Sequence, residues 1–190
     1  MKIIQILILL LLASCNTATQ QKINALEAGL QKYHIELKDG AMAADKRNLP
    51  LFITWINTIP NSAGGAGVAM TFITLSNPPI KYISFHVIPY NRVKDKVASE
   101  VGGKVDAYLQ GTGPFSRNTE NEIRLDWENV WYNSTIECAV IEDIKITLMD
   151  GTVKTYSGND FEDIFLNSYA LSDSVSGNYS TKSKQKSCKS

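Results

Sequence analysis

Residues 122–131 read EIRLDWENVW and alternate between charged or polar and apolar side chains. In an extended chain, Ile123, Leu125 and Trp127 fall on one side, and the charged residues between them fall on the other. This pattern is typical of a strand with one face against a core and one face in water. The segment therefore predicts an antiparallel sheet.

Further apolar runs lie before and after this strand, at residues 51–59, 67–75, 80–90, 104–110, 135–149 and 152–156. Clusters of Gly, Pro, Asn and Ser separate these runs, and no helical pattern lies between them. Such spacing predicts an antiparallel β-sandwich of the immunoglobulin-like or fibronectin-like kind. The chain lacks the Cys, Trp and Cys framework of antibody domains.

Two local connections predict pairing. Residues 76–79 join two apolar runs by so short a link that we expect those runs, 67–75 and 80–90, to pair as antiparallel neighbours. Asp150 and Gly151 predict a two-residue hairpin with a type I′ turn, because that turn needs positive φ at both central positions.

Composition excludes several classes of protein. The 190 residues include 19 basic and 19 acidic side chains, so the formal net charge is zero, which argues against nucleic-acid binding. A hydrophobic content of 44% is too high for a disordered chain, and three cysteines are too few for a disulfide scaffold.

The N-terminal residues carry a predicted targeting signal. Residues 3–12 are apolar except for Gln5 and are too short to span a bilayer, so we predict a signal peptide over residues 1–14. The following sequence Leu12-Ala13-Ser14-Cys15 resembles the lipobox of bacterial lipoproteins. The resemblance implies that Cys15 is acylated, becomes the mature N-terminus and anchors the protein in a membrane. Asn16 after the cysteine favours the outer membrane.

A plain secretory peptide cut near Ala13 is the alternative, and it would leave Cys15 an ordinary thiol.

The chain has two other cysteines, Cys138 and Cys188. Cys138 shares strand parity with apolar neighbours and is predicted to be a buried thiol, with a bridge to Cys188 as the alternative.

The chain divides into four parts. After the signal peptide, residues 15–48 form a spacer that includes a short helix, indicated by the stripe Ile23, Leu26, Leu30 and Tyr33, and residues 40–50 read as a connector. Residues 49–170 form the sandwich and end in a short helix around Phe161, Ile164 and Phe165, which Asp160 caps. Residues 171–190 hold seven Ser and four Lys, which predicts a disordered tail or a contact with anionic lipid or polysaccharide.

No catalytic pattern is present. His34 and His86 have no partner nearby in the sequence, and the chain lacks the G-x-S-x-G, H-E-x-x-H and C-x-x-C patterns. Asp126 and Glu128 share a strand face but read as exposed charges. We therefore predict a non-enzymatic protein with no cofactor and no metal.

One aromatic cluster is a candidate binding site. Trp131 and Tyr132 lie close in sequence to Asn129 and Asn133, and exposed aromatic rings beside amides bind sugars or proteins. Packing in the core is the alternative for the tryptophans.

The stretch Phe72-Ile73-Thr74-Leu75-Ser76-Asn77, continued by residues 80–87 and Pro89-Tyr90-Asn91, resembles bacterial FxLYD-type and fibronectin-like envelope modules. The resemblance implies a small extracytoplasmic sandwich. We expect a lipid-anchored envelope protein that acts as a binding or structural module, with the membrane and another envelope protein or a glycan as partners. A carbohydrate-binding accessory protein and an envelope hydrolase or enzyme inhibitor are the alternatives.

Overall fold

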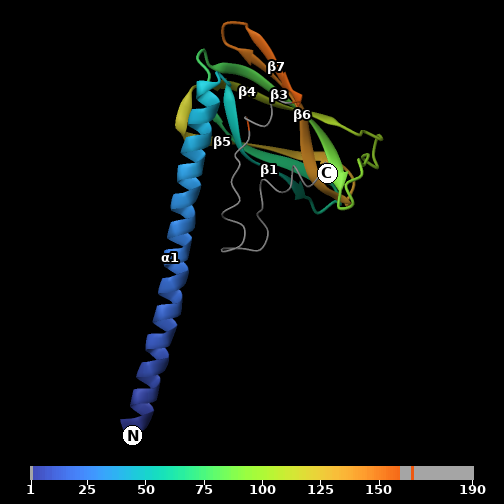
Figure 1. The fold of residues 1–190 in the computed structure, drawn as a ribbon. Helices are drawn as coiled ribbons and strands as arrows, with labels where there is room; N and C mark the ends of the chain where they lie inside the picture. The colour runs from blue at the N-terminus through green and yellow to red at the C-terminus, as the bar shows by residue number, and fades with distance from the viewer. Residues whose placement is uncertain (1, 159–163, 165–190) are drawn as a thin grey trace.

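In the described part of the chain, seven antiparallel strands form two sheets that face each other (Figure 1). The structure, a computed structural model, describes residues 2–158 and Ile164, and it describes side chains from residue 19 onward. Sheet A has the order β1-β2-β5 and contains β1 (Leu51–Pro60), β2 (Ala66–Thr74) and β5 (Asn118–Trp131). Sheet B has the order β4-β3-β6-β7 and contains β4 (Ala107–Phe115), β3 (Ile80–Asn91), β6 (Ile136–Leu148) and β7 (Val153–Ser157).

The predicted β-sandwich is confirmed. In constant-type antibody domains the fourth strand joins the sheet that holds the first two strands. Here β4 pairs with β3 in sheet B, so the chain follows the fibronectin-like variant of the sandwich.

The expected pairing of residues 67–75 with residues 80–90 is wrong. Strand β2 is paired on one side by β1 and on the other by β5, so neither of its edges is open to β3. Residues 76–79 instead carry the chain from sheet A to sheet B. A short link can do this because packed sheets lie only about 10 Å apart.

The core fills the space between the sheets with alternate residues of each strand. Val68, Met70 and Phe72 of β2 are fully buried, and Phe85 of β3 lies at a ring-centroid distance of 6.1 Å from Phe72. The alternation predicted for β5 is confirmed, because Ile123, Leu125 and Trp127 pack on this core while remaining partly accessible at the sheet edge.

Helix α1 (Lys2–Lys46) is much longer than the predicted short helix. The connector expected at residues 40–50 is helical up to Lys46, because this part of α1 buries an apolar face on the outside of sheet A. Gly40 lies against the ring of Phe52 so closely that a Cβ at Gly40 would lie 2.3 Å from the Cζ of Phe52. The buried residues of this contact come from both sides: Leu37, Ala41, Ala44, Phe52, Ile73 and Leu75.

Two polar contacts flank the apolar one. The guanidinium of Arg117 donates to both carboxylate oxygens of Asp45, at 2.8 and 2.7 Å. Tyr33 donates its hydroxyl to the Oε1 of Glu122 at 3.1 Å, and burial together with that carboxylate raises the pKa of Tyr33. The helix is therefore attached to the sandwich at both ends of the docked segment.

The hairpin predicted at Asp150 and Gly151 is present between β6 and β7, but its turn is of another type. Only Gly151 has positive φ, at 88°, and the amide of Gly151 donates to the carbonyl of Leu148. This geometry corresponds to a three-residue loop with glycine in the left-handed position. The prediction of a two-residue type I′ turn is therefore wrong.

The predictions for the C-terminal part are only partly within the described residues. Ile164 is fully buried in the core, and its carbonyl accepts a hydrogen bond from the amide of Ile53 at 2.6 Å. Phe161, Phe165, the capping Asp160 and the tail at 171–190 lie outside the described residues. Cys138 is disulfide-bonded to a partner outside the described side chains, which corrects its prediction as a buried free thiol.

Candidate functional site

The outer face of sheet B carries a histidine in line with two neighbours on adjacent strands. His86 of β3 lies opposite Tyr108 of β4 and opposite Asp143 of β6 in the strand registers. The residues that precede and follow His86, Phe85 and Val87, are buried in the core. Because side chains alternate along a strand, His86 points outward from the sandwich.

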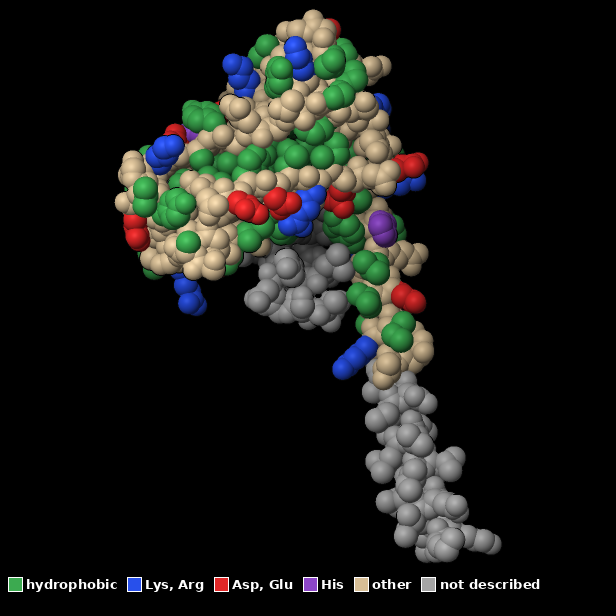
Figure 2. Space-filling model, turned by 180° about the vertical axis from the view of Figure 1, so that it is seen from behind, with side chains coloured by type: hydrophobic (Ala, Val, Ile, Leu, Met, Phe, Trp, Pro, Cys, Tyr) green, Lys and Arg blue, Asp and Glu red, His purple; other side chains and the backbone are tan. Residues whose placement is uncertain are grey.

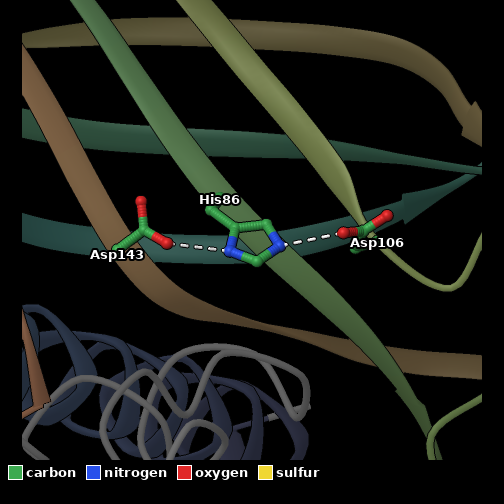
Figure 3. A network of polar contacts seen from close by, with 3 residues as sticks. All are labelled: His86, Asp106 and Asp143. Carbon is green, nitrogen blue, oxygen red and sulfur yellow. Dashed lines mark hydrogen bonds and ion pairs between the residues drawn. The ribbon is translucent and has the colours of Figure 1, made fainter.

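Both ring nitrogens of His86 meet a carboxylate (Figure 3). Nδ1 lies 2.8 Å from the Oδ2 of Asp143, and Nε2 lies 3.0 Å from the Oδ2 of Asp106, which directly precedes β4. A neutral imidazole has one N–H donor, so only the imidazolium donates to both carboxylates at once. The geometry therefore favours a charged histidine between two anions, which we call the His86 clamp.

The pKa of His86 agrees with this geometry. Partial burial acts to lower the pKa of His86, but the hydrogen bonds and charges of Asp143 and Asp106 outweigh it and raise the pKa above its ordinary value. The ring of Tyr108 stacks on the imidazole with centroids 4.5 Å apart and planes 7° apart. A tyrosine face over a cation adds a further attraction to the protonated form.

The clamp is suited to holding strands and a loop together and unsuited to proton transfer. A general base needs a ring nitrogen with a free lone pair, and both nitrogens of His86 are occupied by hydrogen bonds to carboxylates. The two carboxylates lie on opposite sides of the ring, so they do not converge on one point where a metal ion could bind. Among the residues with described side chains, no group of three His, Cys, Asp or Glu side chains is arranged to hold a metal ion.

The aromatic cluster predicted as a binding site is not exposed as a whole. Trp131 is fully buried in the core, which corrects its prediction as an exposed ring and removes it as a surface for stacking a sugar. Tyr132, the residue after it, is 39% exposed.

The two asparagines of that cluster shape loops. Asn129 has φ of 54° and accepts a hydrogen bond from the amide of Asn61 at 2.6 Å. Asn133 donates to the carbonyl of Ala98 at 2.8 Å and accepts from the backbone amide of Thr135. The Asn129 contact links β5 to the β1–β2 turn, and the Asn133 contact with Ala98 ties the β5–β6 connection to the loop between β3 and β4.

The His86 clamp was not recognised from sequence. His86 was noted there, but Asp143 is 57 residues away and Asp106 is 20 residues away. The order of strands β4-β3-β6 brings them together, and the local pattern does not contain that order. Of the two β5 carboxylates considered from sequence, Asp126 forms an ion pair with Arg124 at 2.8 Å, and Glu128 is exposed.

No protein-family model matches this chain, and neither the curated proteins nor the solved structures contain a significant match to it. None of the helical residues with described side chains forms a stretch long and apolar enough to cross a membrane.

The clamp predicts a pH-dependent stability. Because the pKa of His86 is raised on folding, the clamp stabilises the fold fully below the unfolded value of about 6.5 and loses this contribution as pH rises through the folded value. We expect His86→Gln to lower the free energy of unfolding at pH 5.5 by only about 1 kcal/mol, because both carboxylate partners are partly exposed. The loss should be smaller at pH 8.5, where the imidazole is no longer charged. Urea unfolding at both pH values measures the difference.

His34→Gln is the matched control, because His34 is the other histidine and is exposed on α1. At pH 5.5 it should lower the free energy of unfolding by less than His86→Gln does. A His86→Gln effect that is constant with pH, or larger at pH 8.5, would contradict a charged clamp.

Proposed function

We propose that this protein is a lipid-anchored module of the bacterial cell envelope, of the outer membrane where the host has one. It displays a β-sandwich on a helical stalk, without catalytic activity. The observation that carries the proposal is helix α1, which runs without a break from Lys2 to Lys46 and packs on the sandwich through its C-terminal part, where Leu37, Ala41 and Ala44 are buried. Cys15 lies within this helix. A lipid on Cys15 would therefore be separated from the sandwich by helix alone.

The length of the stalk supports this arrangement. At 1.5 Å per residue, the helix between Cys15 and Tyr33, whose hydroxyl bonds to Glu122 of β5, is about 27 Å long. The polar contacts of Tyr33 and Asp45 and the buried contact at Gly40 fix the direction of the sandwich relative to the helix. A fixed spacer of this length would hold the sandwich beyond the lipid headgroups.

The arrangement also supports one surface as the displayed one. Strands β3, β4 and β7 lie farther from the N-terminal end of α1 than β1 and β5 do (Figure 1). The outer face of sheet B carries Tyr82 and Tyr108, which are 48% and 62% exposed. Exposed tyrosines are frequent in protein interfaces, so this face is suited to a partner protein in the envelope.

The anchor is tested by mass spectrometry of the mature protein and by membrane fractionation. We expect the mature chain to begin at an acylated Cys15 and to require detergent for extraction. Cys15→Ser should leave the protein unlipidated and in the soluble fraction. Thr17→Ser, the control, leaves the sequence Leu12-Ala13-Ser14-Cys15 intact and should stay in the membrane fraction. An unmodified Cys15, or a mature chain that begins elsewhere, would contradict the anchor.

The proposal that the outer face of sheet B binds a partner is tested by photo-crosslinking in cells. A photoreactive residue at Tyr82 leaves the His86 clamp untouched and should give a discrete adduct with another envelope protein. The same residue at Met42, which is 46% exposed on α1, should not give that adduct. Absence of an adduct at Tyr82, or the same adduct from both positions, would argue against this face as the binding surface.

A further inference from the structure

The His86 clamp holds the end of a loop as well as two strands. The loop between β3 and β4 comprises residues 92–106, and its last residue is Asp106. The Oδ2 of Asp106 lies 3.0 Å from the Nε2 of His86. The five residues before Asp106, at positions 101–105, are all exposed. The clamp therefore fixes the C-terminal end of an exposed segment.

The first part of this loop is attached to the sandwich independently of the clamp. The amide of Glu100 donates to the carbonyl of Tyr132 at 2.7 Å, and the side chain of Asn133 donates to the carbonyl of Ala98 at 2.8 Å. These bonds hold the loop against the β5–β6 connection. Breaking the clamp would leave them in place.

The second part of the loop depends more on the clamp. The carbonyl of Lys104 accepts a hydrogen bond from the amide of Ser99 at 2.8 Å, which closes the segment on itself rather than on a strand. Pairing of β4 with β3 begins only at Ala107, which lies opposite Val87. The contact of Asp106 with the imidazole is therefore the side-chain attachment that joins the segment to sheet B.

The two carboxylates of the clamp are held with different firmness. Asp143 lies inside β6, where it is opposite His86 on one side and Ser157 on the other. Asp106 precedes its strand and is more exposed than Asp143, at 44% against 34%. Asp106 can therefore turn into water with less disturbance of the sheet.

Loss of the proton from His86 makes one of the two contacts repulsive. A neutral imidazole keeps one N–H, and its other nitrogen presents a lone pair that cannot bond to a carboxylate. Because Asp143 is fixed between two strands, the remaining proton stays on Nδ1. The proton on Nε2 passes to water, and the lone pair it leaves faces Asp106.

Other charged or titratable groups near His86 come from β4 and β6. Tyr108 stacks its ring on the imidazole, Glu142 lies in the bulge of β6, and Lys145 lies opposite Ser84. Figure 2 shows acidic and basic side chains interspersed on the sandwich face that it displays. The two bonded carboxylates are therefore the groups that favour the charged imidazole, as the raised pKa of His86 also indicates.

We propose that the His86 clamp is a pH switch for the end of the β3–β4 loop. With the imidazole charged, Asp106 is bonded and residues 101–106 are held in place. With the imidazole neutral, Asp106 turns into water and the segment loosens, while Asp143 stays bonded to Nδ1. The switch requires neither a lipid on Cys15 nor a partner on sheet B, so its failure is distinguishable from failure of the proposed function.

The ¹⁵N chemical shifts of the imidazole in the full-length protein test which contact breaks. Both nitrogens of His86 should carry a proton at pH 5.5. Above the titration of the ring, which the same spectra locate, only Nδ1 should carry one. A neutral ring with its proton on Nε2 would release Asp143 instead of Asp106 and would overturn the proposal.

Carbon-detected relaxation tests the loosening without relying on amide protons that exchange with water. The order parameters of Val105 and Asp106 should be about 0.85 while the ring is charged and should fall below about 0.6 once it is neutral. Order parameters that stay the same across the titration would contradict the switch.

Two variants separate the clamp from a general effect of pH on the loop. Asp106→Asn supplies an amide that can either donate or accept, so it can bond to Nε2 with or without a proton and should keep the segment ordered throughout. Asp95→Asn, the control, removes the same charge from an exposed residue of the same loop that the clamp does not use. It should loosen with pH as the unmodified protein does. Loosening that persists in Asp106→Asn, or that is lost in Asp95→Asn, would overturn the proposal.

Discussion

The contact between Gly40 of α1 and the ring of Phe52 is the joint on which the arrangement of this molecule depends. A side chain at position 40 would overlap the ring, so only glycine lets the helix approach sheet A this closely. The approach buries Leu37, Phe52 and Ile73 to 9% exposure or less. Each fully buried side chain of this size stabilises a contact by about 1.5–3 kcal/mol.

The polar contacts around the joint are weaker and serve orientation. Asp45 and Arg117 form a bidentate ion pair, but their side chains are 41% and 43% exposed. Exposed ion pairs contribute up to about 1 kcal/mol to stability. The apolar contact therefore supplies most of the attachment. The ion pair and the Tyr33–Glu122 hydrogen bond favour one direction of the helix over others that would bury similar area.

The sequence predicted the sandwich well because alternation along a strand reports directly which side chains are buried. It predicted too short a helix, since residues 40–50 look like a connector unless Phe52 and Ile73 are known to need a cover. It placed Trp131 on a candidate surface because burial of a residue at the end of a strand depends on the opposite sheet. The His86 clamp was missed for a related reason, because its partners are set by strand order rather than by sequence spacing.

The clamp and the joint act on opposite faces of the sandwich. The clamp holds β4 and the residue before it against β3 and β6 on sheet B, while the joint holds the stalk against sheet A. With both in place, a partner bound on sheet B would be held at a fixed distance and angle from the base of the stalk.

The central claim is that the docked part of α1 and the sandwich move as one body, and residual dipolar couplings measure this directly. Couplings from amides of residues 33–46 and of the two sheets should fit a single alignment tensor. In Gly40→Leu, where the joint cannot close, the helix couplings should shrink and require a tensor of their own. Separate tensors in the unmodified protein would contradict the account.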